Sequence, residues 1–231
     1  MKKIGILGGL GPESTADYYR EIIMPFNTKY TALAYPEIIV FSANINEFMD
    51  FVAVKDWSGL CGWLLDKIDA LHRAGAEFVA IASNTPHIVF DEIQAKSPVP
   101  LLSIVEATCN RALEMGLKKI GLMGTQLTME ADFYKKPFLS EGIAVIVPSE
   151  EEQRLIHHRL FSEIELGIFN DSTRNELLAI AKRMVEEEKI DGLILGCTEL
   201  PLIMMEDKYD IPFLNTTAIH CEAILTYCMN G

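Results

Sequence analysis

The chain has 231 residues, 49% of them hydrophobic and 23% charged, and its formal net charge at neutral pH is −13. An acidic chain of this kind lacks the clustered lysine and arginine that binding to nucleic acids or anionic membranes requires. Its apolar runs are far shorter than the roughly 20 residues that span a bilayer, and its first residues lead into a strand pattern instead of a secretory signal. We therefore expect a cytoplasmic protein that acts on a small molecule and binds neither nucleic acid nor membrane.

The five cysteines do not form a recognisable framework. They are an odd number and none is spaced as C-x-x-C, so neither a set of disulfides nor a zinc site is indicated, and no metal is expected. Reduced thiols are the expectation. Four of them fall on the apolar faces of predicted helices and should pack inward, namely Cys61, Cys109, Cys221 and Cys228.

The chain opens with a strand at residues 3–7, a glycine-rich loop and a helix at 15–28. The loop reads Gly8-Gly9-Leu10-Gly11-Pro12-Glu13-Ser14-Thr15. Its glycines allow a close approach to a ligand, and hydroxyls at a helix start suit an anion, so Gly9 and Leu10 are candidate substrate-binding residues. The G-x-G-x-x-G fingerprint is incomplete, and we expect no nucleotide cofactor.

The rest of the first half contains three more strands. The pattern predicts strands at 36–42, 75–83 and 100–104, a helix at 57–74, and a strand-to-loop edge at 43–48 that faces the ligand. The third strand ends at Ser83, which Asn84, Thr85 and Pro86 follow. His87 comes one helical turn after Ser83, and we interpret it as a hydrogen-bonded structural residue more readily than as a catalytic one.

The second half has the same alternation of strands and helices. We predict strands at 120–123, 144–148, 191–196 and 211–214, and helices at 105–115, 131–140, 152–167, 175–188 and 217–228. After its first strand, Thr125 and Thr128 offer hydroxyls where the first half has its glycine loop, which makes them candidate substrate ligands. The strand at 191–196 stops at Cys197, and Thr198, Glu199 and a proline follow.

Three landmarks recur in the same order at nearly one separation. Residues 2–8 return as 118–124 after 116 residues, Ser83 is matched by Cys197 after 114, and residues 99–102 are matched by 211–214 after 112. We infer an internal duplication. The predicted fold is α/β, with two similar domains at 1–110 and 111–231 that carry parallel, four-stranded sheets related by a pseudo-twofold axis, and the last helix could pack on the first domain.

The two duplicated strand ends indicate where chemistry takes place. Open α/β sheets bind ligands at the carboxyl ends of their strands, where Ser83 and Cys197 lie. If the two residues face each other across one cleft, one can remove a proton from a stereocentre while the other returns one to the opposite face. A thiol with an ordinary pKa of about 8.5 can be made more acidic by a helix N-terminus, whereas a serine hydroxyl is a poor base unless a neighbour activates it.

With these motifs the whole chain resembles the aspartate/glutamate racemase family of cofactor-independent amino-acid racemases. The resemblance rests on the opening Gly8-Gly9-x-Gly11-Pro12-x-Ser14-Thr15, on Ser83-Asn84-Thr85, on Gly124-Thr125 and on Gly196-Cys197-Thr198-Glu199. It implies two α/β domains with an active site between them, a homodimer and no cofactor. It also implies a catalytic role for Cys197 and a role in holding the substrate for Asn84, Thr85, Thr198 and Glu199.

The sequence departs from the family pattern at three places. Ser83 stands where the family's first catalytic cysteine would be. Residues 44–52 lack the arginine that aspartate-specific relatives carry there, and the lysine often found just before Gly167 is missing. The resemblance therefore implies an amino-acid racemase or epimerase of the aspartate/glutamate type, with Ser83 as an altered partner of Cys197, and leaves the substrate open.

Two other functions remain compatible with the same residues. One is a decarboxylase or isomerase that uses a single cysteine to protonate a carbanion or an enediolate. The other is a protein that binds an amino acid or another carboxylate without turnover. Proton exchange at the substrate α-carbon in D₂O separates binding from catalysis, and release of carbon dioxide identifies a decarboxylase.

Overall fold

The computed structural model describes residues 1–29, 35–204 and 207–230. The chain forms two compact units, one of Met1–Ile104 with Thr217–Gly231 and the other of Val105–Thr216. Each unit contains one four-stranded sheet, as the sequence predicts, and all the paired strands within both sheets are parallel. Among the described helices, none is long and apolar enough to cross a membrane.

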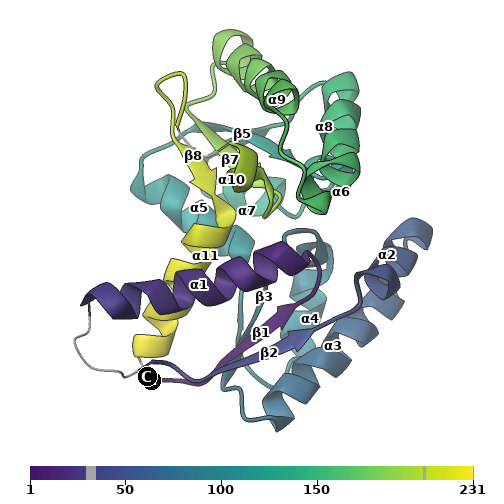
Figure 1. Cartoon of the computed structure of the whole chain (residues 1–231), viewed down its shortest axis with the longest axis vertical. Coiled ribbons are helices and arrows are strands. Elements are labelled where there is room, and N and C mark those ends of the chain that lie inside the picture. The colour runs from purple at the N-terminus through teal and green to yellow at the C-terminus, as the bar shows by residue number, and fades with distance from the viewer. Residues whose placement is uncertain (30–34, 205–206, 231) are drawn as a thin grey trace. The chain divides into compact units, whose positions relative to one another are not determined.

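The first unit is built around a sheet with the strand order β2-β1-β3-β4, of which Figure 1 labels β1, β2 and β3. One face of the sheet packs against α3 through residues such as Leu7 and Leu64, and the other packs against α1 and α11 through residues such as Ile6, Tyr18 and Ile224. This alternation follows from the two-residue period of a strand. Its elements are β1 (Ile4–Gly8), α1 (Pro12–Lys29), β2 (Ile38–Ser42), α2 (Ile45–Val54), α3 (Trp57–Arg73), β3 (Phe78–Ile81), the 3-10 turn η1 (Thr85–Val89), α4 (Phe90–Lys96), β4 (Leu101–Leu102) and α11 (Thr216–Met229).

The second unit repeats this topology with the strand order β6-β5-β7-β8. The pairing register repeats as well, because Ile4 pairs with Phe78 in the first sheet and Ile120 with Gly192 in the second. Its elements are α5 (Ile104–Glu114), β5 (Lys119–Gly124), α6 (Gln126–Glu130), α7 (Lys135–Ser140), β6 (Ala144–Ile146), α8 (Glu150–Ser162), the 3-10 turn η2 (Ile164–Leu166), α9 (Asp171–Arg183), the π-helical turn η3 (Met184–Glu188), β7 (Gly192–Gly196), α10 (Leu200–Ile203) and β8 (Phe213–Asn215).

Two of the predicted segments have a different structure. Residues 43–48 do not form a strand-to-loop edge, because Asn44 caps α2 by accepting a hydrogen bond from the Asn46 N–H, and Phe48 is buried in the core. The predicted helix at 152–167 is interrupted, since α8 ends at Ser162 and η2 ends at Gly167, whose φ of 74° is in the left-handed region. This interruption brings η2 to the site described below.

The helix predicted at residues 131–140 begins only at Lys135, as α7. A short helix, α6, precedes it, and Thr125 caps α6 by accepting a hydrogen bond from the Thr128 N–H.

The two units divide after Ile104 and again before Thr217, whereas the sequence predicts a single division after residue 110. The last helix belongs with the first unit because Cys221, Ile224 and Cys228 complete the apolar cluster on one face of that sheet.

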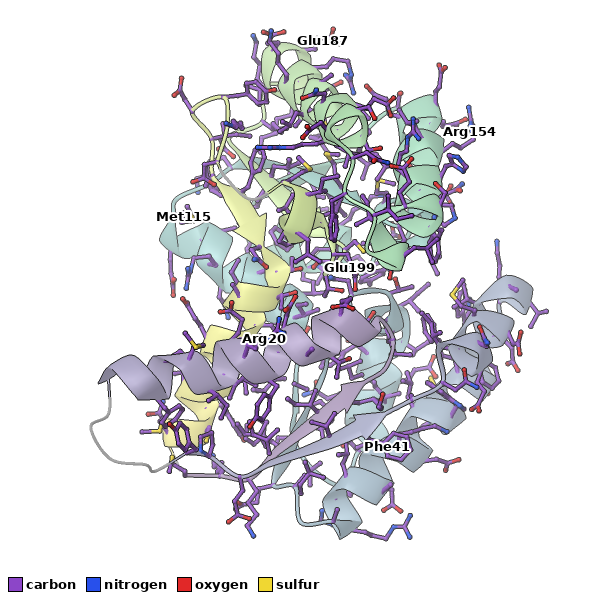
Figure 2. The ribbon with its side chains drawn as sticks, in the orientation of Figure 1. Arg20, Phe41, Met115, Arg154, Glu187 and Glu199 are labelled. Carbon is purple, nitrogen blue, oxygen red and sulfur yellow. The ribbon has the colours of Figure 1, made fainter. Side chains whose placement is uncertain are left out.

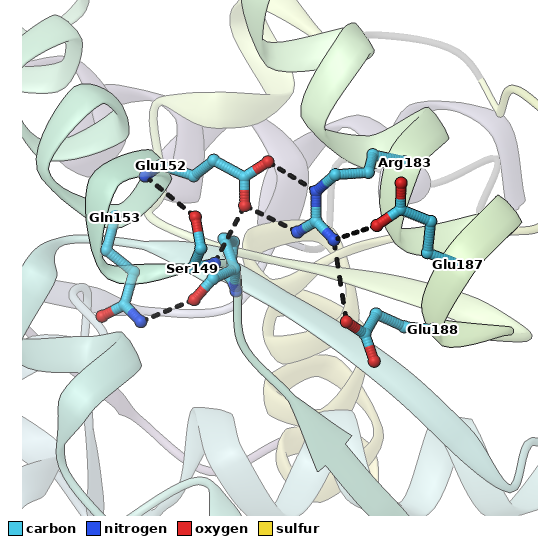
Figure 3. Close-up of polar contacts among 7 residues, drawn as sticks. Ser149, Glu152, Gln153, Arg183, Glu187 and Glu188 are labelled. Atoms are coloured by element: carbon cyan, nitrogen blue, oxygen red, sulfur yellow. Dashed lines mark hydrogen bonds and ion pairs between the residues drawn. The ribbon is translucent and has the colours of Figure 1, made fainter.

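The start of α8 is held by a network of charged groups (Figure 3). Ser149 and Glu152 form a capping box, in which the Ser149 hydroxyl accepts from the Glu152 N–H and the Glu152 carboxylate accepts from the Ser149 N–H. Arg183 of α9 binds both oxygens of Glu152 at 2.6 Å and also pairs with Glu187 and Glu188. These contacts fasten α8 to α9, so that the direction in which the chain leaves α8 is set.

Candidate active site

Cys197 directly follows β7, at the carboxyl end of a fully buried strand. Gly124 and Gly196 allow the ends of β5 and β7 to approach closely, since a Cβ atom added to Gly124 would lie 2.8 Å from the Gly196 carbonyl oxygen. The chain then turns into α10, whose first N–H, that of Leu200, donates to the Cys197 carbonyl over 3.1 Å. The Cys197 side chain is 5% exposed.

Two carboxylates lie against the Cys197 thiol. The Sγ atom is 3.1 Å from Glu199 Oε2 and 3.6 Å from Glu165 Oε1, and the Thr198 hydroxyl donates to the same Glu199 oxygen over 2.8 Å. Glu199, labelled in Figure 2, is 2% exposed, and its second oxygen, Oε1, is buried without a hydrogen-bond partner. One donor atom from each of Cys197, Glu165 and Glu199 lies within 4.8 Å of the others, so the three could share a single cation.

Glu165 reaches the thiol because the two residues before it have their side chains fixed elsewhere. The Glu163 carboxylate pairs with Arg159 and accepts hydrogen bonds from Asn170 and Thr173. Ile164 is buried in the core of the second unit. With these two side chains held, Glu165 between Ile164 and the exposed Leu166 is directed to Cys197.

Without a ligand, the Cys197 thiol and the Glu165 carboxyl group hold their protons more tightly than usual. Burial raises the pKa of the Cys197 thiol well above its ordinary value, and the negative charges of Glu199 and Glu165 raise it further. Burial, with the nearby Glu199 carboxylate, also raises the pKa of Glu165 to about 8. The acidifying effect expected from a helix start is present as a hydrogen bond from the Glu199 N–H, but desolvation and two carboxylates outweigh it. The expectation of a more acidic thiol is therefore wrong for the free protein.

The equivalent strand end of the first unit is less charged. Ser83 and Asn84 follow β3 by two and three residues and are nearly buried, at 9% and 3% exposed. Among the described residues of this unit, no side chain forms a hydrogen bond with the Ser83 hydroxyl that would activate it as a base. Thr85 begins the 3-10 turn η1.

His87 has a structural hydrogen bond, as the sequence analysis expects. Its Nε2 accepts from the Ile104 N–H over 3.3 Å, and its ring stacks on Phe90. Burial lowers the pKa of His87 to about 4, so the ring is neutral at physiological pH. A second buried histidine that the sequence analysis did not single out, His220, bonds the Tyr18 hydroxyl at 2.8 Å and the Leu102 carbonyl at 3.0 Å.

The two loops that were expected to bind substrate have internal hydrogen bonds. The Gly9 N–H donates to the Thr15 hydroxyl, and the hydroxyls of Ser14 and Thr15 both donate to the Gly11 carbonyl. Leu10 is 7% exposed. In the second unit, the Thr125 and Thr128 hydroxyls are 3.0 Å apart at the start of α6. These groups shape their loops in the free protein, and their contact with a substrate stays a prediction.

The structure thus gathers Cys197, Thr198 and Glu199 in the second unit and adds Glu165, which the sequence analysis missed. Gly9, Leu10, Ser83, Asn84 and Thr85 belong to the first unit. The sequence signal for Glu165 was present but weak: an acidic residue in a short segment that ends in Gly167, after a helix. Nothing in that segment indicates contact with a cysteine 32 residues further along the chain.

The chain is an α/β protein of two units, each with a parallel sheet of the same strand order, and it has a strand-end cysteine beside two acidic side chains. Comparison with known proteins shows the family to which it belongs. Residues 7–224 match the Asp/Glu/hydantoin racemase family. The chain belongs to this family and is an isomerase of the racemase type.

Known relatives cover almost the whole chain. A putative Asp/Glu racemase from Yersinia pestis is 34% identical, with a TM-score of 0.89 over 99% of this chain and 100% of that one. An aspartate racemase homologue from Pyrococcus horikoshii OT3 is 38% identical, with a TM-score of 0.85 over the same shares. The broad-specificity amino-acid racemase RacX of Bacillus subtilis is 26% identical over 220 residues, 93% of each chain.

Proposed function

We propose that this protein is an amino-acid racemase or epimerase that works without pyridoxal phosphate and exchanges the α-proton through Cys197. The observation that carries the proposal is the contact of the Cys197 thiol with the Glu199 carboxylate at 3.1 Å. A carboxylate at this distance can accept the thiol proton, and the resulting thiolate can remove a proton from carbon.

Substrate binding supplies the positive charge that the free site lacks. Both carboxylates and burial hold the proton on sulfur, so the thiol is a poor base until positive charge arrives. The α-ammonium group of an amino acid brings that charge, and it lowers the cost of forming the thiolate beside Glu165 and Glu199. The free enzyme would thus keep an unreactive thiol, and the bound substrate would activate it.

We infer that Ser83 serves the opposite face of the α-carbon. This assignment is supported by the equivalent topological positions of the two residues, since Ser83 follows β3 and Cys197 follows β7, the third strands of two sheets with the same order. The Ser83 hydroxyl lacks an activating partner among the described residues of its own unit, so we expect the two faces to exchange at different rates. Asn84, Thr85 and Thr198 are proposed to hold the α-carboxylate and the amino group, with Gly9, Leu10, Thr125 and Thr128 near the substrate.

The relatives indicate which substrates to test first, and the net charge of the chain indicates which partners are not expected. Relatives are named for aspartate and glutamate or for broad specificity, and the resemblance favours the aspartate/glutamate type as the first to be tested. We expect the enzyme to act in the cytoplasm as a homodimer, which sedimentation equilibrium would establish. A net charge of −13 supports the absence of a nucleic-acid or membrane partner.

The decisive experiment follows α-proton exchange in D₂O by NMR for a panel of amino acids. Wild-type protein should exchange the α-proton, and Cys197→Ser should lose at least about a thousandfold of that rate, because a hydroxyl is a far weaker acid than a thiol. Cys109→Ser is the matched control, since Cys109 is buried in the same unit with its thiol on the Pro137 carbonyl, and its substitution should retain exchange. Exchange of the α-proton by Cys197→Ser at the wild-type rate would contradict the catalytic role of Cys197. Release of carbon dioxide would instead identify a decarboxylase.

A further inference from the structure

Glu165 and Glu199 form a pair of carboxyl groups without an ion-pair partner among the described residues of their own unit. They lie 3.6 Å and 3.1 Å from the same sulfur atom, and the buried Glu199 Oε1 has no partner. The arginine beside η2 is engaged elsewhere, because Arg159 pairs with Glu163 and Glu176. In the described part of the second unit, neither carboxylate has a lysine or arginine within ion-pair distance.

A buried anionic pair of this kind is unfavourable by itself. Charges taken out of water are normally paired or neutralised by a partner. Here Glu199 is 2% exposed, and one of its oxygens is buried without a hydrogen-bond partner. The arrangement is therefore suited to a ligand that carries hydrogen-bond donors and positive charge.

The reacting carbon of a substrate would be close to both carboxylates. If Cys197 exchanges the α-proton, its sulfur must approach the α-carbon to roughly 3 to 3.5 Å. Each carboxylate lies about as far from the sulfur, so both lie within roughly 7 Å of that carbon, in reach of ammonium groups on it and on its side chain. The α-ammonium group can satisfy one of them, and the second is left for the side chain of the substrate.

We propose that this pair makes the enzyme selective for amino acids with a positively charged side chain, of the ornithine or lysine type, over aspartate and glutamate. The inference rests on the proposed function of Cys197 and names the substrate class of that site. A side-chain ammonium group is attracted to the two carboxyl groups, whereas the side-chain carboxylate of glutamate brings a further acidic group against them. Glu165 is then a specificity-determining residue and Glu199 the shared partner of substrate and thiol.

The test compares ligands of matched length: ornithine with a terminal ammonium group, glutamine with an amide, and glutamate with a carboxylate. Binding is measured by calorimetry and α-proton exchange by NMR in D₂O, both in EDTA so that no metal occupies the carboxylates. Wild-type protein should bind ornithine at least about tenfold more tightly than glutamate, with glutamine between them. Glu165→Gln should reduce the ornithine-to-glutamate ratio by about tenfold, which corresponds to about 1.4 kcal/mol.

Glu151→Gln is the matched control, because it removes the same charge from an exposed position on α8 and should leave the ratio unchanged. A wild-type preference for glutamate, or a ratio that Glu165→Gln does not alter, overturns the inference and leaves the racemase function standing. Ornithine selectivity that depends on Glu165 without α-proton exchange supports the inference and overturns the proposed function. A preference that appears only when zinc replaces EDTA assigns the pair to a metal and overturns the inference. If Glu165→Gln does not fold, the wild-type order of the three ligands decides.

Discussion

At the scale of single residues, burial and the Glu199 carboxylate together raise the pKa of Cys197 and of Glu165. The carboxylate lies 3.1 Å from the Cys197 sulfur, and its charge contributes to the raised pKa of both Cys197 and Glu165. Burial is the larger cause in each case, because desolvation penalises a thiolate and a carboxylate alike.

The raised pKa of Glu165 predicts a dependence of stability on pH. Folding raises this pKa from an ordinary 4.5 to about 8, so between these values the folded chain binds a proton that the unfolded chain has released. Stability then falls as pH rises through this window. Glu165→Gln removes the effect, and its advantage in unfolding free energy over wild type should grow by at least about 1 kcal/mol from pH 5 to pH 8, since one unit of pKa is worth about 1.4 kcal/mol.

Urea denaturation at four pH values across that window measures this difference. Glu151→Gln serves again as the control, and its difference from wild type should stay nearly constant because the side chain is exposed. A constant difference for Glu165→Gln as well would mean that the carboxyl is ionised in the folded protein throughout the window.

At the scale of elements, the position of Glu165 depends on how α8 begins and ends. The helix starts in a capping box at Ser149 and is tied to α9 by Arg183, as Figure 3 shows. It stops at Ser162, and the interactions of Glu163 then direct η2. A continuous helix through residue 167 would have turned Glu165 according to the helical period instead of these contacts.

Ser149→Ala should destabilise the protein by about 1 kcal/mol, because the first turn of α8 loses the acceptor for the Glu152 N–H. The measurement is the urea midpoint at an unchanged slope. Ser140→Ala is the comparison, since this exposed hydroxyl ends a helix and its loss should cost less than about 0.5 kcal/mol. Equal effects of the two substitutions would show that the capping box contributes no more than an ordinary surface hydroxyl.

At the scale of the whole molecule, the duplication predicts what a second thiol would do. The two sheets share their strand order, and Ser83 takes in the first unit the place of Cys197 in the second. Ser83→Cys should raise racemisation by about tenfold, or roughly 1.4 kcal/mol in the barrier, because a thiol has a pKa much closer to neutral pH than a hydroxyl has, in nearly the same shape. Wild-type enzyme should act faster on one enantiomer, and Ser83→Cys should reduce that asymmetry.

Rates in both directions for each enantiomer pair, in wild type and Ser83→Cys, check this expectation. Ser97→Cys is a suitable control, since it adds a thiol elsewhere in the same unit, beyond α4. If the thiol at position 83 leaves both rates unchanged or lowers them, Ser83 binds the substrate or serves another reaction instead of acting as a weakened base.

Local pattern in the sequence determined the strands, most of the helices and the repeat. Apolar runs that stop at Ser83 and Cys197, and glycines such as Gly8 and Gly124 at equivalent places, act over a few residues, so they can be recognised without knowing the fold. Cys197, Thr198 and Glu199 were found as a group for the same reason. Asn44 also gave a local signal, as a helix cap, but the polar stretch around it was interpreted as an edge and not as the start of α2.

Only the tertiary structure decided the chemistry around the thiol. Glu165 is 32 residues from Cys197, and Tyr18 is 202 residues from His220, so neither contact has a local signature. The direction of the Cys197 pKa also depended on the fold, because a helix start acidifies a thiol whereas burial beside two carboxylates does the opposite. Periodicity shows which face of a segment is buried, but burial of charge depends on which distant segments meet, and that is set by packing over the whole unit.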